Sequence, residues 1–448
     1  MLRSICAAAC VLLAHANKQI VDDNNNLVQD SSVLLQAFDW YSAGNTSGWY
    51  VYMMSIAKTV SQDFEYVWLP PPSQSVDTQG YMPGKWFNFN SNYCNKTELV
   101  GLINEFKKHN NNIHIVADVV VNHRCGSKQD HLPGVDTQCQ DKWIIFEEPA
   151  WGPEMIVSYD LHRDGGPHEY YEVPNVCGPG NNDTGNNFHA APDVDHTNEQ
   201  VQKDVATYLE TLKGLGFDSW RFDMAEGYAG KYVSQYLKGT WGDDYGKFSV
   251  GEYYEGSVER LQQWVNEAER NAFAFDFAFR YTLYDTINAD DFSGIMSGND
   301  LKGLIGTPTY SKRSVTFVDN HDTMEMTDRK AWQKTNPDDA KKIIQAYAIS
   351  LTHPGLPSVF FDHYVDNKMQ ETLQGFIAFR KRMNIQTGSD VYVLKHEPGI
   401  YEVLINKDKS NEVLLRVGSK TQQLPTDEKY KIAFTGPNYT IFERKNLN

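Results

Sequence analysis

Residues 216–223 read GFDSWRFD, a short stretch with three aromatic side chains that ends in an acid. The segment before it carries apolar residues that recur at helical spacing on one face: Val201, Val205, Tyr208, Leu209, Leu212 and Leu215. A helix that leads into a short buried strand is the repeating unit of α/β proteins. The stretch therefore predicts a strand of a parallel sheet, with Asp223 at its carboxyl end.

The same rhythm continues in both directions along the chain. Other amphipathic stripes occur at 99–106 and 343–351. Short apolar runs that read as buried strands lie at 33–38, 64–69, 113–121, 216–222, 248–252, 272–279, 314–319 and 356–361. Eight strands that alternate with helices predict an α/β fold, a (β/α)₈ TIM barrel, and the alternative on rhythm alone is an open doubly wound sheet.

Two segments depart from this rhythm. Residues 124–197 are rich in Gly, Pro, Asn and Asp without a clear strand–helix unit, which predicts a small domain inserted after the third strand. Residues 386–448 read as short strands joined by turns, which predicts an antiparallel C-terminal β domain. The barrel would then consist of residues 17–123 and 198–385.

The N-terminus has the pattern of a secretory signal peptide. Arg3 supplies a positive charge, an apolar run follows at 5–13, and residues 14–16 match the small-x-small pattern of a cleavage site. The apolar run is too short to span a bilayer, and no later run is long enough. We expect residues 1–16 to be a signal peptide and the protein to be secreted, or delivered to a lysosome or vacuole. A buried N-terminal helix is the alternative.

The composition argues against two classes of partner. The net charge of −17 disfavours nucleic acid, because a phosphate binder needs a basic face, and it equally disfavours an anionic membrane surface. A neutral polymer would be indifferent to this charge. Aromatic residues make up 13% of the chain, and exposed aromatics suit the flat apolar faces of sugar rings.

Four cysteines remain after residue 16: Cys94, Cys125, Cys139 and Cys177. An oxidising compartment would allow three pairings among them, which the sequence does not distinguish, and free buried thiols are the alternative. Glycosylation sequons, which are compatible with secretion, begin at Asn45, Asn95, Asn182 and Asn438.

Acids occur at the predicted carboxyl ends of four barrel strands. Asp118 and the pair Asn122-His123 belong to the third strand, Asp223 ends the fourth, Glu252 ends the fifth, and His321-Asp322 follows the seventh. A single acid at a strand end is more often a helix cap than a catalyst. Barrels of this kind place their reactive groups at the carboxyl ends, so the joint occurrence predicts one shared site.

Four stretches in this order carry a family resemblance. DVVVNH at 118–123, GFDSWRFD at 216–223, GEYY at 251–254 and FVDNHD at 317–322 resemble the signature stretches of the alpha-amylase family of glycoside hydrolases. Other stretches are similar to plant-type members of that family: WLPP at 68–71, QGYMP at 79–83, APDVDH at 191–196 and LTHPG at 351–355. The resemblance covers essentially the whole chain after residue 16.

The resemblance implies a carboxylate trio that cleaves a glycosidic bond. Asp223 would be the nucleophile that forms a covalent glycosyl-enzyme, and Glu252 would be the general acid and then the general base. Asp322 would hold the sugar hydroxyls and favour distortion of the ring. The family retains anomeric configuration, so the carboxyl groups of Asp223 and Glu252 should lie about 5–5.5 Å apart.

The resemblance also implies substrate-binding residues. His123 and His321 would donate hydrogen bonds to the sugar in the cleavage subsite, and Tyr81 would stack on its ring. Arg221 lies two residues before Asp223, so it shares a strand face with the nucleophile and would place a positive charge beside it. Asp118 is expected to be structural support.

A calcium ion (Ca2+) is implied at the junction of the inserted domain and the barrel. The positions that match the family's ligands are Asn122, Asn187, Asp193 and the carbonyl groups of Ala190 and Gly227. All of them offer oxygens, which a hard cation prefers. Asn187 stands where plant-type members carry Asp, so one charge is lost and binding should weaken. Asp183 would keep a carboxylate nearby.

Glu226 is a second departure from the family pattern, which has Lys at this position in a sugar subsite on the leaving-group side. The change adds a negative charge close to Asp223 and Glu252. We expect altered subsite affinity and a raised Glu252 pKa rather than lost activity.

The resemblance thus implies a secreted, calcium-dependent alpha-amylase that hydrolyses internal α-1,4-glucosidic bonds of starch, glycogen and malto-oligosaccharides. One alternative is an α-glucan transglycosylase, which the motifs alone barely separate from a hydrolase. Another is a non-catalytic carbohydrate-binding protein on the same barrel, which the presence of all three acids disfavours. A monomer is the default expectation.

Overall fold

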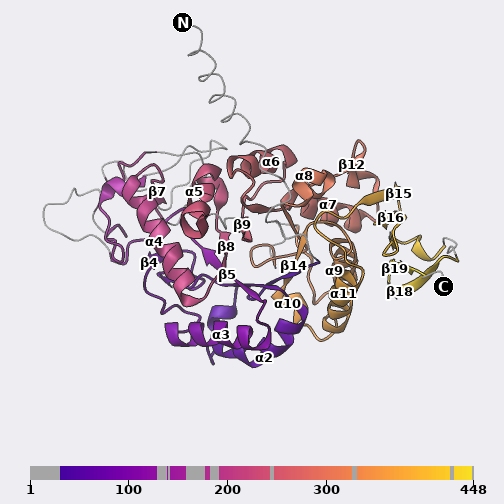
Figure 1. Cartoon of the computed structure of the whole chain (residues 1–448), viewed down its shortest axis with the longest axis horizontal. Coiled ribbons are helices and arrows are strands. Elements are labelled where there is room, and N and C mark those ends of the chain that lie inside the picture. Colours follow the sequence, from indigo (N-terminus) through magenta and orange to yellow (C-terminus); the bar gives the residue numbers. More distant parts are fainter. Residues whose placement is uncertain are drawn as a thin grey trace, which may run out of the picture.

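The computed structural model describes residues 31–128, 139, 142–157, 177–181, 191–242, 247–324, 330–423 and 428–445. Within these residues, eight parallel strands close into a barrel (Figure 1). The strands are β1 (Leu34–Gln36), β2 (Tyr66–Leu69), β5 (His114–Val119), β8 (Ser219–Phe222), β9 (Ser249–Gly251), β10 (Phe273–Phe275), β13 (Ser314–Phe317) and β14 (Leu356–Phe360). Their positions confirm the eight strands predicted from the apolar runs.

The barrel closes because its first strand pairs on both sides. Leu34 of β1 lies opposite Tyr66 of β2 and also opposite Ser358 of β14. The open doubly wound sheet is therefore excluded. Most strand residues are fully buried, which explains why the runs are continuous rather than alternating.

Helices cover the outside of the barrel (Figure 1). The longer ones, each placed between or after barrel strands in the described part of the chain, are α2 (Trp49–Asp63), α3 (Lys96–His109), α4 (Glu199–Leu215), α5 (Gly230–Trp241), α6 (Val258–Glu267), α7 (Phe277–Ala289), α9 (Pro337–Ser350) and α11 (Gln370–Arg382). Shorter elements are α8 (Pro308–Ser311), α10 (Phe361–Tyr364), β3 (Gln74–Ser75), β4 (Pro83–Lys85), β6 (Ile156–Val157), β7 (Asp193–Val194), β11 (Met296–Ser297) and β12 (Asp300–Leu301). Six 3₁₀ turns that the structure also describes are η1 (Ser42–Gly44), η2 (Pro153–Met155), η3 (Ala225–Gly227), η5 (Ser293–Ile295), η6 (Leu304–Gly306) and η8 (Thr421–Gln423).

Local sequence determines where α4 begins and ends. The Asn198 side chain accepts hydrogen bonds from the backbone N–H groups of Gln200 and Val201, which caps the first turn. The helix ends at Gly216, whose φ of 109° lies in the left-handed region that favours glycine. Its buried face consists of residues predicted from helical spacing: Val201, Val205, Tyr208, Leu209 and Leu212. Because this face packs against the barrel, the chain enters β8 soon after the helix ends, and Asp223 follows β8 directly.

The segment after β5 breaks the barrel pattern, as predicted. Its described part contains a two-stranded antiparallel sheet of β6 and β7. Arg124 attaches this segment to the barrel, because its guanidinium donates to the carbonyl groups of Gly84, Glu147 and Pro149 at 2.9, 2.6 and 2.8 Å. The guanidinium carbon lies 4.5 Å from the centre of the Trp151 ring. The inserted segment is thus tied to β4, which follows Tyr81 in the chain.

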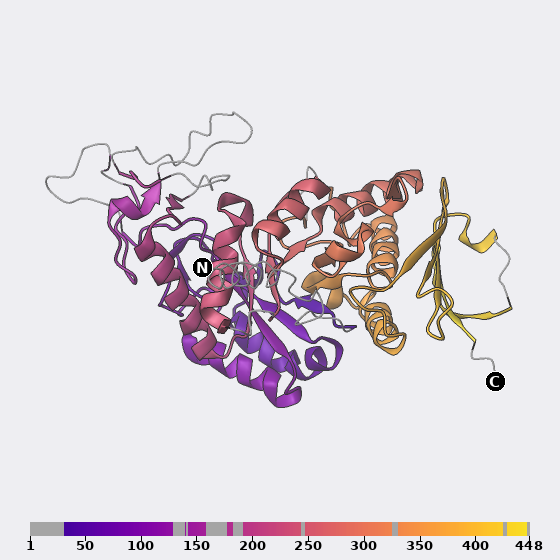
Figure 2. The ribbon, with the colours of Figure 1, turned by 45° about the horizontal axis from the view of Figure 1, so that its top comes forward.

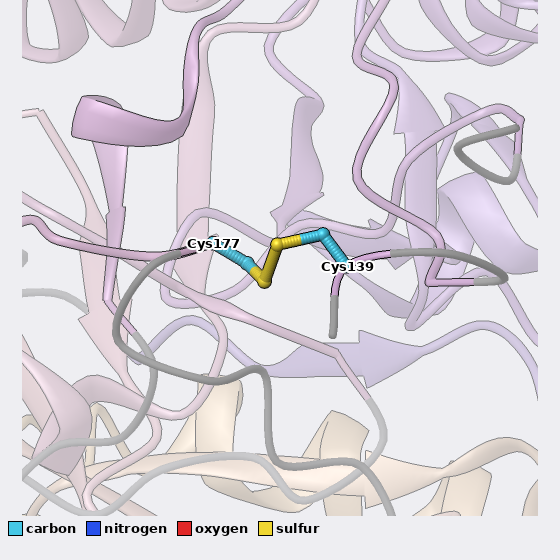
Figure 3. The surroundings of a disulfide bond; sticks show 2 residues. All are labelled: Cys139 and Cys177. Atoms are coloured by element: carbon cyan, nitrogen blue, oxygen red, sulfur yellow. A yellow bond between two sulfur atoms is a disulfide. The ribbon is translucent and has the colours of Figure 1, made fainter. Parts of the chain in front are cut away.

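A disulfide joins Cys139 and Cys177 inside this segment (Figure 3). The Cys139–Cys177 bond excludes two of the three pairings left open by the sequence, and the third is only half formed, since Cys94 and Cys125 are free thiols. Cys125 is buried and Cys94 is partly buried, so free thiols and one disulfide coexist.

The C-terminal residues form the predicted antiparallel β domain. The five strands, in sheet order, are β15 (Val391–Glu397), β16 (Ile400–Ile405), β17 (Val413–Val417), β19 (Tyr439–Arg444) and β18 (Tyr430–Gly436). The sheet lies beside α9 and α11, at the opposite end of the molecule from the described part of the inserted segment (Figure 1 and Figure 2). A hydrogen bond of 2.8 Å between His353 Nε2 and the Tyr401 hydroxyl joins sheet and barrel.

No helix in the described part of the chain is both long enough and apolar enough to cross a membrane.

Candidate active site

A cavity of about 780 Å³ opens at the carboxyl ends of the barrel strands. Its described lining residues are Trp40, Asp77, Tyr81, Met82, Asp223, Met224, Glu226, Glu252, Tyr254, Tyr281, His321, Asp322 and Lys330. Six residues predicted from the sequence are among them, including all three acids of the predicted trio. Of the other predicted substrate-binding residues, Arg221 and His123 are buried and are not among these lining residues.

The strand register places the two central acids side by side. Phe222 at the end of β8 lies opposite Gly251 at the end of β9. The chain continues this ladder for one residue, because Glu252 N–H donates to the Phe222 carbonyl at 2.9 Å. Asp223 and Glu252 are therefore neighbours at the mouth of the barrel, and each is only 6 to 7% exposed.

Arg221 joins these acids from below. Its Nη1 lies 2.6 Å from Asp223 Oδ1 and 2.9 Å from Asp118 Oδ1, and its Nη2 lies 2.8 Å from Glu252 Oε1. The Arg221 side chain is 1% exposed, so one buried cation serves three buried carboxyl groups. This excess of acid over base is costly for folding, and such strain is typical of functional sites.

The surroundings of Glu252 favour its protonated form. Burial raises the Glu252 pKa well above its ordinary value, Arg221 partly opposes this, and the negative charges of Asp322, Asp223 and Glu226 raise the pKa further. Glu252 Oε2 also accepts a hydrogen bond of 3.1 Å from the backbone N–H of Met224. A raised pKa suits a carboxyl group to act as a proton donor.

Asp118 supports the site from inside the barrel, as expected from the sequence. It is fully buried and accepts hydrogen bonds from Trp68 Nε1 at 3.1 Å and from the Tyr81 hydroxyl at 2.9 Å. Burial raises the pKa of Asp118 to about 7, although Arg221 acts in the opposite direction. Asp118 thereby links Arg221 to Tyr81.

Three aromatic rings form one wall of the cavity. Tyr81 is stacked on His321, with ring centres 5.2 Å apart, and on Trp40, with centres 6.3 Å apart. Gln36 Nε2 donates to His321 Nδ1 at 2.7 Å, so Nε2 of the same ring is left to carry the proton, 3.2 Å from Asp322 Oδ2. His321 Nε2 therefore faces Asp322 as a donor, and the expected hydrogen bond from His321 to a sugar stays a prediction.

The structure places His123 behind this wall. Its Nε2 donates to the Tyr81 carbonyl at 2.7 Å, and its Nδ1 accepts from Asn122 Nδ2 at 3.3 Å. Both ring nitrogens thus have protein partners. The expected hydrogen bond from His123 to a sugar stays a prediction.

The predicted calcium ligands are only partly described. Asn122 and Asp193 are buried side by side, with Asn122 Nδ2 3.1 Å from Asp193 Oδ1, and Gly227 lies buried in η3. Among the described residues, Asn122 Oδ1 is buried without a hydrogen-bond partner, which fits a cation ligand. Other predicted ligands lie outside the described residues: Asn187, Ala190 and Asp183. Clusters of three or more acids, histidines or cysteines that could hold a metal do not occur within the described ranges.

Sequence reasoning missed several lining residues: Trp40, Asp77, Met82, Met224, Tyr254, Tyr281 and Lys330. Trp40 follows the first strand. The search of strand carboxyl ends for acids would have found it if aromatic residues had been included. Tyr254 lies inside the GEYY stretch itself. Three further residues reach the cavity only through the fold: Asp77 and Lys330 from loops, and Tyr281 from α7. No local sequence pattern marks any of them.

The comparison with family models agrees with this geometry. Residues 61–364 match the model described as alpha amylase, catalytic domain. The chain belongs to this family. The match spans the barrel from the end of α2 to α10 and includes all three acids of the site, and it identifies the chain as a glycoside hydrolase.

Relatives with similar sequences include two proteins of Arabidopsis thaliana. The chain is 30% identical to alpha-amylase 3, chloroplastic, over 97% of its own length and 46% of that protein. It is 28% identical to probable alpha-amylase 2 over 94% of its own length and 96% of that protein. The chain thus spans about half of the first relative and nearly all of the second.

Among solved structures, the chain is similar to the alpha-amylase of Geobacillus thermoleovorans in complex with acarbose. The TM-score is 0.65 at 12% sequence identity, over 93% of this chain and 99% of that one. At this identity the likeness concerns the fold, and it extends over the barrel and the C-terminal domain alike.

Proposed function

We propose that this member of the alpha-amylase family hydrolyses internal α-1,4-glucosidic bonds of starch, glycogen and malto-oligosaccharides with retention of anomeric configuration. The observation that carries the proposal is the pair of neighbouring acids, Asp223 and Glu252, held by one guanidinium in the cavity. Family membership supports the substrate class, and the open cavity suits a polymer chain.

In the proposed mechanism, Asp223 attacks the anomeric carbon while Glu252 gives its proton to the leaving oxygen. This breaks the glycosidic bond and leaves a covalent glycosyl-enzyme. Glu252, now a carboxylate, removes a proton from water, which attacks the anomeric carbon and frees Asp223. Two inversions retain the configuration. Asp322 would hold the hydroxyl groups of the sugar, with His321 beside it, and Tyr81 would stack on its ring.

A digest of soluble starch tests this proposal. We expect iodine staining to fall quickly, a mixture of malto-oligosaccharides to appear, and the newly formed reducing ends to be α-anomers by proton NMR. In a parallel digest of one defined malto-oligosaccharide, products longer than the substrate without a gain of reducing ends would identify a transglycosylase. If no new reducing ends form, the proposed hydrolysis is wrong, and unchanged product sizes in the same digest would then identify a non-catalytic carbohydrate-binding protein.

We propose that a calcium ion joins the inserted segment to the barrel through Asn122, Asp193 and the Gly227 carbonyl, with further ligands from Asn187, Ala190 and Asp183. The unpartnered Asn122 oxygen supports this, within the described part of the chain. The ion would supply positive charge that holds these oxygens together and stabilises one wall of the cleft.

Removal of calcium should lower the thermal stability of the protein, which can be measured independently of activity. We expect EGTA to lower the melting temperature, because loss of a ligand present at about 100 times its Kd costs roughly 2.7 kcal/mol. Differential scanning fluorimetry checks this, with added Ca2+ but not Mg2+ restoring the transition. Asn122→Ala should abolish the response to calcium. An unchanged melting curve in EGTA would rule the site out.

The charge at Glu226 should control the pH dependence. Glu226 is one of the negative charges that raise the Glu252 pKa, and its Oε2 is fixed by the Tyr254 backbone N–H at 3.1 Å. As pH rises through the raised pKa, Glu252 loses its proton and the rate falls. Glu226→Lys should lower this pKa and move the alkaline limb of kcat/KM to lower pH. It should also change KM for malto-oligosaccharides by about two- to five-fold.

The measurement for this prediction is kcat/KM against pH on oligosaccharides of several lengths, since that ratio reports the free enzyme. Glu226→Gln is the matched neutral variant, and the alkaline limb of its kcat/KM profile should lie between those of Glu226→Lys and the wild type. Identical profiles and KM values for all three proteins would show that Glu226 has no such role.

The remaining assignments are proposals of the same kind. We propose that residues 1–16 are removed, that 17–123 and 198–385 form the barrel domain, that 124–197 form the inserted domain and that 386–448 form the C-terminal domain. Secretion, or delivery to a lysosome or vacuole, and a monomeric state would accompany this. N-terminal sequencing and light scattering on the secreted protein would decide these points.

A further inference from the structure

The loop between β3 and β4 folds around one carboxylate. Asp77 Oδ1 accepts hydrogen bonds from the backbone N–H groups of Gly80 at 3.0 Å and Met82 at 3.1 Å, and Oδ2 accepts one from Tyr81 at 3.3 Å. The Ser75 hydroxyl also donates to Oδ1. Three successive backbone N–H groups therefore converge on a single side chain.

The carboxylate is the acceptor for the N–H groups of Gly80 and Tyr81, whereas the Met82 N–H is shared with Ser75 Oγ at 3.1 Å and the Met82 carbonyl accepts from the Val76 N–H at 3.0 Å. Buried backbone N–H groups require acceptors, and an ionised carboxylate offers several lone pairs to charged hydrogen bonds. Gly80 adopts a φ of 96°, and a Cβ there would lie 2.9 Å from Pro71 Cβ. The turn thus admits only glycine, which leaves the loop little freedom to find other acceptors.

Hydrogen bonds from backbone N–H groups, rather than an ion pair, stabilise the Asp77 carboxylate. Within the described part of the chain, no lysine, arginine or histidine forms an ion pair with Asp77. Asp77 also lines the cavity, next to Tyr81 and Met82. Its interactions therefore concern this loop and the cleft rather than a surface ion-pair network.

The loop carries Tyr81, which is fixed at three points of its own. Its N–H donates to Asp77, its carbonyl accepts from His123 Nε2 at 2.7 Å, and its hydroxyl donates to Asp118 Oδ2 at 2.9 Å. The ring is 8% exposed and stacked on His321. Asp77 contributes the contacts that set the backbone position of Tyr81, whereas His123 holds its carbonyl and Asp118 holds its ring hydroxyl.

We propose that Asp77 is a positioning residue for glycoside hydrolysis, which acts by holding Tyr81 against the sugar in the cleavage subsite. This rests on the proposed starch hydrolysis, because only then does the Tyr81 ring contact a reacting sugar. Asp77 itself performs no chemical step. Its effect on the rate passes entirely through Tyr81, and that distinguishes it from a residue that merely stabilises the fold.

A double-mutant cycle tests this dependence. The variants are Asp77→Ala, Tyr81→Ala and the double variant with both changes. Each is assayed for kcat and KM on one malto-oligosaccharide. Asp77→Ala should lower kcat/KM by about 10- to 100-fold, as a misplacement of about 1 Å in a reacting complex does. In the Tyr81→Ala background the same change should lower kcat/KM by less than about two-fold, because contacting residues that act together are not additive.

Two further variants separate positioning from folding. Asp77→Asn keeps an oxygen that can accept from Gly80 and Met82, so it should regain most of the activity lost in Asp77→Ala. Asp291 is a matched control, because its carboxylate likewise accepts from a loop backbone N–H, that of Ser293 at 3.0 Å, and lies outside the cavity lining. Asp291→Ala should leave kcat/KM unchanged. Near-UV circular dichroism checks that each variant is folded.

Equal fold-losses for Asp77→Ala in the wild-type and Tyr81→Ala backgrounds would overturn the proposal. So would a folded Asp77→Asn variant whose kcat/KM falls markedly, and by the same factor, in the wild-type and Tyr81→Ala backgrounds, and this second outcome is decisive even when Asp77→Ala does not fold. A wild-type protein that releases no reducing ends from starch would instead contradict the proposed hydrolysis. The two failures are therefore distinguishable.

Discussion

Asp223→Asn should abolish starch hydrolysis while leaving the fold intact. The amide lacks the charge needed to attack the anomeric carbon, so no glycosyl-enzyme forms. The expected loss in kcat is roughly 10⁴- to 10⁶-fold, the range found when the nucleophile of a covalent mechanism is removed. The variant should fold, because the amide oxygen can still accept the hydrogen bond that Arg221 Nη1 gives to Asp223 Oδ1. Release of reducing ends from starch provides the measurement.

The control for this prediction is Asp338→Asn. Asp338 is an exposed acid in the first turn of α9 and forms an ion pair with Lys341 on the outside of the barrel. Its replacement should leave kcat within about two-fold, because exposed ion pairs contribute little. Wild-type kinetics in Asp223→Asn would contradict the nucleophile assignment, and a loss shared equally by Asp338→Asn would point to a general effect of the substitutions.

The barrel could be predicted because its signals are local. Each strand is buried on both faces, so its sequence is a short apolar run, and each helix presents an apolar stripe at a fixed period. The catalytic candidates were accessible for the same reason. Asp223 and Glu252 come directly after β8 and β9, and the parallel register brings them together without any loop in between.

Other parts of the site depend on contacts that sequence spacing does not encode. Tyr281 lies on α7, and Lys330 lies in the connection after β13, yet both line the same cavity. The role of Asp77 depends on a turn that closes on its own carboxylate. The disulfide presented the same difficulty, since three pairings were equally compatible with the spacing of four cysteines.

Shared use of one guanidinium is the feature of the site with the strongest consequences. Arg221 contacts three carboxyl groups, those of Asp118, Asp223 and Glu252, and all four side chains are at most 9% exposed. Burial of so many acids is tolerable only while the cation is present. We therefore expect catalysis and stability to depend on the same residue.

Arg221→Met should damage both properties. Methionine fills a similar volume without the charge or the donors, so three buried acids lose their counter-ion. We expect the free energy of unfolding to fall by about 3–5 kcal/mol, the cost of removing one partner from a buried ion pair. The variant's kcat should fall by roughly 100- to 1,000-fold, the cost of a lost electrostatic contact in an active site. The stability and kcat of Arg221→Lys should lie between those of Arg221→Met and the wild type, because one ammonium cannot bridge three carboxyl groups as the planar guanidinium does.

A second-site change makes this prediction specific. Asp118→Asn removes one of the acids left unpaired in Arg221→Met, and Asp118 does not line the cavity among the described residues. The double variant should therefore be more stable than Arg221→Met alone, by about 0.5–3 kcal/mol, as contacting pairs are when measured in a cycle. Its kcat should stay low, because Asp223 and Glu252 still lack the cation. Urea denaturation with parallel kinetics measures both quantities. If Asp118→Asn lowered the stability of Arg221→Met further, repulsion among the acids would not be what destabilises the variant, and the shared guanidinium would matter through its hydrogen bonds alone.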